Sequence, residues 1–187
     1  MLIARTLVEA QTYLSLAMAA DPSATSVEPP EIQPGVNLTE GEDAWTLTSS
    51  AGDITVRYAS EEAARAVGAR FGLGVSELVD AAQWAMVARS YADRALAADL
   101  AYEGEALGTA RRLVELNWEF AAEAQYEALK FLPEDADRIP DEGVWSEYGR
   151  QAVEREPGLL TRAKLNDDRE YYEGTLQDFI RFWNSRS

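Results

Sequence analysis

Four glutamates repeat at every fourth residue of the segment 109–132, and they form the most regular set of chemically active side chains in the sequence. They are Glu115, Glu119, Glu123 and Glu127. Because an α-helix turns once in about 3.6 residues, this spacing places the four carboxylates along one edge of a helix. Like charges at this spacing destabilise a helix by about 0.2–0.5 kcal/mol per pair. Arg111 and Arg112, a turn earlier, could offset part of this charge. We therefore expect the row either to bind a cationic partner, or to be a solvated edge or neutralised by arginines of neighbouring helices, such as Arg89, Arg94 or Arg162.

The sequence contains no histidine and no cysteine, which excludes several kinds of chemistry. Ser-His-Asp triads, cysteine nucleophiles, thiolate zinc sites and Glu-x-x-His di-iron sites all need one of these residues. Carboxylates alone could hold Ca²⁺ or Mg²⁺. However, Asp135 and Asp137 lack the glycine and closing glutamate of an EF-hand, and the acids near Asp167 lack the spacing of a diphosphate-binding motif. We expect no metal and no cofactor, and binding rather than catalysis.

The charge balance restricts the partners. The 187 residues include 33 acidic and 17 basic ones, for a net charge of −16. Nucleic acids and anionic membranes attract basic proteins, so we expect neither as a partner. Glu9 and Gln11 interrupt the apolar N-terminal run, which disfavours a signal peptide, and no stretch is long enough to span a bilayer. We expect a cytoplasmic protein whose partner is a basic protein.

Helices must position these carboxylates. The segment 109–132 contains no glycine or proline, Thr109 can cap it, and Pro133 ends it. It has apolar residues on two flanks, so it is expected to lie between neighbours. Periodicity and capping residues predict further helices over 6–19, 60–71, 76–100, 145–155 and 161–184, the last antiparallel to the central helix. Thr6, Ser60 and Ser76 are the predicted caps of the first three.

A short β pattern precedes most of these helices. Residues 20–37 hold four of the seven prolines and predict an extended tether. Residues 44–49 and 54–59 predict a hairpin, which a strand near 36–38 could extend. The prediction is a mainly α fold: a bundle of about five to six helices with a small N-terminal β-hairpin appendage. We expect one domain over 1–187, with a helix at 1–19, the tether and hairpin at 20–59 and the helical bundle at 60–187.

The expected binding surface combines the glutamate row with the acidic, proline-bounded loop at 133–144 and two tryptophans. Its residues are Glu115, Glu119, Glu123, Glu127, Glu134, Asp135, Asp137, Trp45 and Trp145. Charge would steer the association, and an aromatic anchor would supply affinity. Two alternatives stay open. One is an enzyme or small-ligand binder that uses carboxylates, tyrosines and arginines in a cleft between hairpin and bundle. The other is a structural homo-oligomer such as a homodimer.

Three blocks of the sequence resemble a family of small bacterial proteins seen in actinobacteria and myxobacteria. The first two lie at Ile3–Leu14 and Leu78–Trp84. The strongest comprises Leu129–Pro133, Ala136-Asp137, Ile139-Pro140, Trp145-Ser146-Glu147, Gly149-Arg150, Glu156-Pro157-Gly158 and Arg162. Family members often carry Cys-x-x-Cys pairs in a β-rich insert, and this sequence has none, so a zinc-stabilised insert is not expected. The family resembles genes of polymorphic-toxin systems, so the resemblance implies an immunity-like protein whose basic partner is a toxin.

Overall fold

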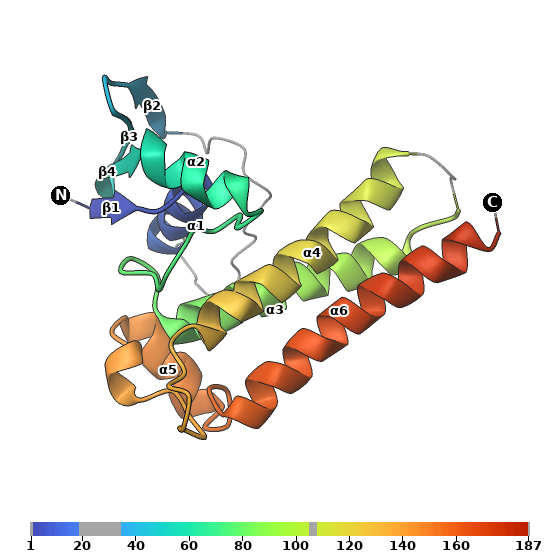
Figure 1. Ribbon diagram of the computed structural model, residues 1–187. Helices are drawn as coiled ribbons and strands as arrows, with labels where there is room; N and C mark the ends of the chain where they lie inside the picture. The colour runs from blue at the N-terminus through green and yellow to red at the C-terminus, as the bar shows by residue number, and fades with distance from the viewer. Residues whose placement is uncertain (1, 19–34, 105–107, 187) are drawn as a thin grey trace. The chain divides into compact units, whose positions relative to one another are not determined.

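The computed structural model describes residues 2–18, 35–104 and 108–186, which group into two compact units, Met1–Asp80 and Ala81–Ser187 (Figure 1). Six α-helices and a small four-stranded sheet make up the described part of the chain, which confirms a mainly α fold. Most of the predicted tether at 20–37 lies outside the described residues. The expectation that the chain is one domain stays a prediction.

The sheet of the first unit is larger than the predicted hairpin. Its strands are β1 (Leu2–Ala4), β2 (Asn37–Glu40), β3 (Ala44–Ser49) and β4 (Gly52–Arg57), in the order β1-β4-β3-β2. The hairpin β3–β4 is confirmed, with Leu47 opposite Ile54 on the buried face. The added strand β2 pairs with β3 as predicted. The parallel strand β1 was not predicted, because three residues are too short to show a period-two pattern.

Two helices pack on this sheet. They are α1 (Leu7–Met18) and α2 (Tyr58–Ala66), and both contact β4. The predicted cap of α1 is confirmed, since the Glu9 amide donates to Thr6 Oγ1 at 3.1 Å. The predicted cap of α2 is wrong: this helix begins before Ser60, whose hydroxyl donates to the Arg57 carbonyl oxygen at 2.9 Å.

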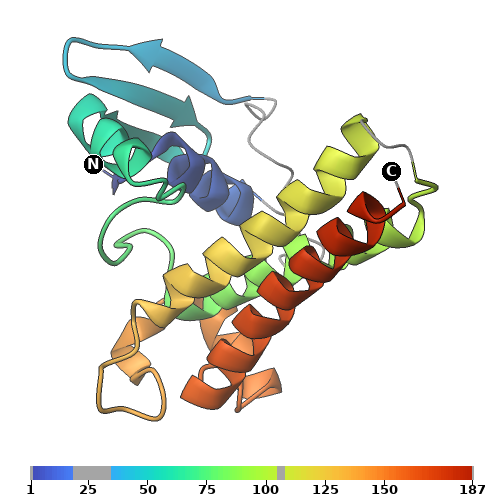
Figure 2. The same cartoon turned by 45° about the vertical axis from the view of Figure 1, so that its right-hand side comes forward.

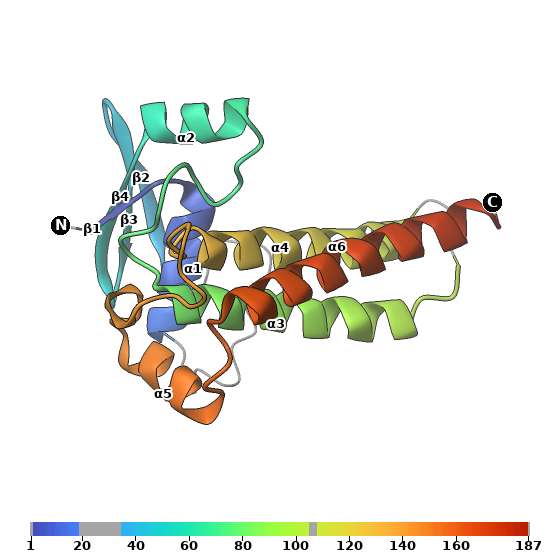
Figure 3. The same ribbon diagram turned by 60° about the horizontal axis from the view of Figure 1, so that its bottom comes forward.

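Three long helices form the body of the second unit. They are α3 (Ala81–Leu100), α4 (Thr109–Leu129) and α6 (Arg162–Asn184). Helix α4 packs against both α3 and α6, and α6 runs antiparallel to it as predicted (Figures 2 and 3). Tyr91 of α3 stacks on Phe120 of α4 with ring centroids 4.8 Å apart. None of the helices within the described ranges combines the length and apolarity that crossing a bilayer requires.

Short elements connect α4 to α6. A 3₁₀ turn, η2 (Asp141–Gly143), and helix α5 (Glu147–Arg155) occupy this connection. Ser146 caps α5 by accepting from the Gly149 amide at 2.9 Å, and Thr161 caps α6 by accepting from the Lys164 amide at 3.4 Å. By contrast, Ser76 does not start α3. Its hydroxyl accepts from the amides of Leu78 and Val79 in a tight turn, and α3 begins only at Ala81.

Candidate functional site

The first two glutamates of the α4 row are neutralised on their own helix. Arg111 Nε donates to Glu115 at 2.9 Å. The two terminal nitrogens of Arg112 donate to the two oxygens of Glu119 at 2.9 and 3.2 Å. The expectation that Arg111 and Arg112 offset part of the charge is confirmed, and both arginines belong to the preceding turns of α4. Arg89 instead pairs with Glu156 at 2.7 Å.

The last two glutamates of the row are withdrawn from the surface. Glu123 is half-buried. Glu127 is only 4 % exposed, and its carboxylate accepts from Lys130 Nζ at 2.5 Å. The Lys130 ammonium also lies 5.3 Å from the ring centre of Tyr126, and Arg169 lies 5.1 Å from it on the α6 side. The row therefore presents mixed charge rather than one acidic edge.

A second set of predicted acids lies on the connection after α4. We call residues 133–142 the acidic loop. Its carboxylates are all exposed, and they belong to Glu134, Asp135, Asp137, Asp141 and Glu142. Within the described part of the chain, none of these side chains has a hydrogen-bond or ion-pair partner. The loop thus concentrates negative charge that the rest of the unit does not neutralise.

Arg162, the first residue of α6, fixes the backbone of the acidic loop. Its Nη2 lies 2.7 Å from the carbonyl oxygens of Pro133, Glu134 and Ala136. Its Nε donates to Ala136 at 3.0 Å, and its amide donates to the Asp137 carbonyl at 2.7 Å. Hydrogen bonds from a charged donor are stronger than neutral ones. The loop carbonyls therefore face Arg162. The backbone that carries the carboxylates is held in place before any partner binds.

We expect Arg162→Gln to lower the free energy of unfolding by about 1–2 kcal/mol. Each hydrogen bond from a charged group is worth about 1.5–3 kcal/mol. However, three of these bonds share one nitrogen, Nη2, and a cation at a helix N-terminus is unfavourable by about 0.3–1 kcal/mol. Hydrogen exchange should also accelerate at the amides of Ala136 and Ile139, which bond to Pro133 and Leu160. Urea denaturation and exchange measurements check this expectation.

Arg155→Gln is the matched control, because Arg155 is an exposed arginine on the neighbouring helix α5. Its unfolding free energy should stay within about 0.5 kcal/mol of the wild type. Equal stability and equal exchange in the two variants would contradict the bracing role of Arg162.

One of the two predicted tryptophans lies in the same stretch of chain. Trp145 is 41 % exposed, and its ring centroid lies 5.9 Å from that of Phe131. Its backbone carbonyl accepts from Arg150 Nη1 at 2.7 Å, which fixes this turn before α5. Trp45 belongs to the other unit, where it packs edge-on against Tyr58 at 4.4 Å. The acidic loop and Trp145 therefore form the candidate surface of the second unit.

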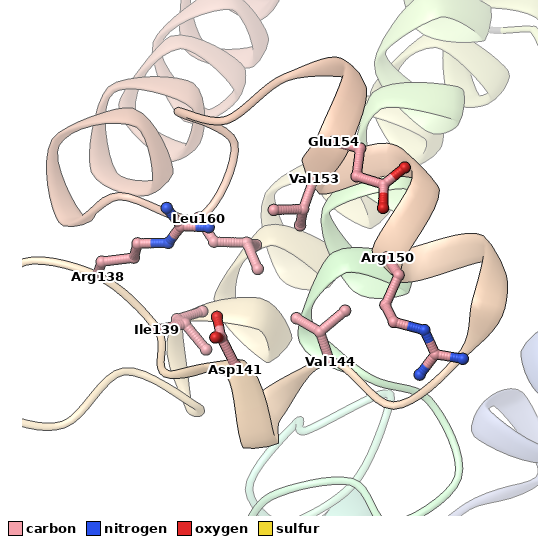
Figure 4. Close-up of a pocket in the computed structure, with 8 residues that line it drawn as sticks. All are labelled: Arg138, Ile139, Asp141, Val144, Arg150, Val153, Glu154 and Leu160. Atoms are coloured by element: carbon pink, nitrogen blue, oxygen red, sulfur yellow. The ribbon is translucent and has the colours of Figure 1, made fainter.

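A cavity of about 360 Å³ opens within the same segment (Figure 4). Its apolar lining consists of Ile139, Val144, Val153 and Leu160. Its charged lining consists of Arg138, Asp141, Arg150 and Glu154. Periodicity in the sequence did not reveal it, since these residues come from the loop, η2, α5 and the turn before α6. A proline-bounded acidic loop that contains one basic residue, Arg138, was a signal that could have indicated it.

Burial raises the pKa values of two acidic side chains in the second unit, Tyr172 and Asp99. Burial raises the pKa of the Tyr172 phenol, and the nearby Asp168 carboxylate raises it further. A phenol that is harder to ionise is a poor general base at neutral pH. Burial also raises the pKa of the Asp99 carboxyl. Neither residue lines the cavity. Among the described residues, moreover, no three carboxylates are grouped so that they could hold a metal ion.

The resemblance to a family of small bacterial proteins stays a prediction, because it depends on short blocks of sequence. Its strongest block, which runs from Leu129 to Arg162, coincides with the acidic loop, Trp145 and the bracing arginine. Comparison of the chain with protein-family models, with curated proteins and with solved structures finds no match.

Proposed function

We propose that this protein binds a basic protein partner through the acidic loop and Trp145, and not along α4. The observation that carries the proposal is the set of five exposed carboxylates without partners among the described residues, on a backbone that Arg162 braces. A braced loop loses little conformational freedom on binding, so more of the interaction energy is kept as affinity.

Charge and an aromatic anchor contribute differently to such an interface. Unpaired surface carboxylates raise the association rate with a basic protein, and the effect falls as salt rises. An exposed tryptophan that becomes buried at the centre of an interface slows dissociation. The candidate surface supplies both elements in one short segment. The sequence resemblance adds an immunity-like role, in which the basic partner is a toxin.

The proposal is tested on the partner captured from a lysate of the source organism and then purified. Three neutralised loop acids (Glu134→Gln, Asp135→Asn, Asp137→Asn) should lower the association rate constant at low salt by about tenfold. Trp145→Ala should raise the dissociation rate constant by about thirtyfold, which corresponds to about 2 kcal/mol. Stopped-flow or surface-based kinetics over a range of salt concentrations measure both.

A control with the same change in net charge separates the two acidic segments. It carries Glu115→Gln, Glu119→Gln and Glu123→Gln on α4. This variant should associate within about twofold of the wild type, because two of these carboxylates are already paired with arginines. If the α4 variant slows association as much as the loop variant, or if the purified partner is acidic, the proposal is wrong.

A further inference from the structure

The cavity within residues 138–160 carries opposite charges that the protein leaves unpaired. Arg138, Asp141 and Glu154 line it, and none of these three side chains has a hydrogen bond or ion pair to any residue that the structure describes. Arg138 and Asp141 lie on one side of the group and Glu154 on the other (Figure 4). The fourth charged residue, Arg150, is engaged by the Trp145 carbonyl and by Glu147, and its guanidinium points away from the group.

The backbone holds these rim residues in fixed places. Arg138 forms an isolated antiparallel bridge with Thr161, and the next amide, that of Ile139, donates to the Leu160 carbonyl at 3.1 Å. Asp141 begins the 3₁₀ turn, where its carbonyl accepts from the Val144 amide at 3.0 Å. Glu154 lies on α5, whose end is tied to α3 by the Arg89–Glu156 pair.

The floor between the charged groups is apolar. Ile139 and Leu160 are buried, and Val144 and Val153 are half-buried. A volume of about 360 Å³ lies at the lower end of the range for small-molecule sites, about 300–1,000 Å³. The cavity therefore suits a small ligand with a hydrocarbon tail and charges of both signs.

We propose that this cavity binds a free aliphatic α-amino acid. The carboxylate of the ligand would pair with the Arg138 guanidinium, whose planar fork matches a carboxylate. The ammonium group would pair with Asp141, which lies on the same side of the group as Arg138, and the aliphatic side chain would cover the apolar floor. An anion alone would face two carboxylates, and a cation alone would leave Arg138 without a counter-charge. The site shares Asp141 with the acidic loop, but ligand binding there goes beyond the proposed partner interface and does not require a partner.

The test titrates the isotope-labelled full chain with leucine and follows its amide resonances by NMR. Saturable shifts are expected at residues 138–160, with a dissociation constant in the millimolar range. Isoamylamine and 4-methylpentanoate each lack one charged group and should bind about two- to fivefold more weakly. Glycine keeps both charges but lacks the tail, and it should bind at least about tenfold more weakly.

Variants of the rim assign the two ends of the ligand. Arg138→Gln should weaken leucine binding by about two- to fivefold and leave isoamylamine binding unchanged. Asp141→Asn should weaken the binding of both compounds, and Arg155→Gln, outside the cavity, should weaken neither. The proposal is overturned if leucine gives no saturable shifts in this segment. It is also overturned if isoamylamine binds as tightly as leucine and Arg138→Gln changes nothing. Neither result bears on partner binding, which the loop variants test separately.

Discussion

Replacement of Trp118 by alanine is expected to lower the free energy of unfolding of the helical unit by about 3–5 kcal/mol. Trp118 is 1 % exposed on α4, and its ring centroid lies 6.1 Å from those of Tyr171 and Tyr172 on α6. The substitution leaves a cavity between α4 and α6 that packed helices can close only in part. Because a domain of this size is stable by about 5–15 kcal/mol, much of the stability would be lost.

This substitution also bears on the candidate surface. The acidic loop starts where α4 ends, and Arg162, which braces it, is the first residue of α6. Loosened packing between the two helices should therefore speed hydrogen exchange in the loop as well as lower the midpoint of urea unfolding.

Two matched variants make the Trp118 result interpretable. Trp145→Ala removes the same side chain from an exposed position and should cost about 1 kcal/mol or less. Trp118→Phe keeps an aromatic ring, and the indole N–H has no hydrogen-bond partner among the described residues. It should therefore cost less than the alanine variant. If Trp118→Ala and Trp145→Ala unfold at the same urea concentration, the assigned core is wrong.

A second large effect is expected at Glu9 in the first unit, where alanine should cost about 3–5 kcal/mol. Glu9 is 1 % exposed, and its carboxylate accepts from the Arg5 amide at 2.6 Å and from Arg5 Nε at 2.9 Å. Arg5 also donates to the Gly74 carbonyl at 2.5 Å. Loss of Glu9 would leave a largely buried guanidinium without its counter-charge, at the junction of β1, α1 and the loop at 70–74.

A double-mutant cycle separates the pair from its parts. Arg5→Leu combined with Glu9→Leu should cost less than the sum of the two single variants, because both charges are removed together. Glu62→Ala on α2 is the control, since Glu62 is exposed, and its unfolding free energy should change by about 0.5 kcal/mol at most. Additive costs in the cycle, measured by urea denaturation, would show that the pair does not act as a unit.

Local patterns predicted most of the secondary structure. The helices at α1, α4, α5 and α6 and the hairpin β3–β4 follow from periodicity and from residues such as Thr6, Pro133 and Thr161. These signals act over a few residues, so they can be read in order along the chain. The predicted starts of α2 and α3 were wrong because the local signal at each start was ambiguous. Ser60 and Ser76 are good capping residues, but each bonds to a neighbouring turn instead.

The candidate site was predicted only in part. The sequence correctly indicated an acidic, proline-bounded loop, and the structure places Glu134, Asp135, Asp137 and Trp145 in one segment of the second unit. The sequence could not show that Glu127 is buried, because the burial of one turn of α4 depends on the helices packed against it. Nor could it show the cavity, whose lining residues meet only after the connection between α4 and α6 has folded.

By itself, therefore, the sequence determined the helical class, the net charge of −16 and the absence of histidine and cysteine chemistry, because composition and periodicity do not depend on distant contacts. The tertiary structure alone decided which carboxylates are buried. Glu127 is only 4 % exposed on the packed helix α4, whereas the loop acids stay exposed. Arg162 reaches the Pro133 carbonyl across 29 residues of sequence. No local pattern encodes a contact over that separation, since it forms only when α6 packs back on α4.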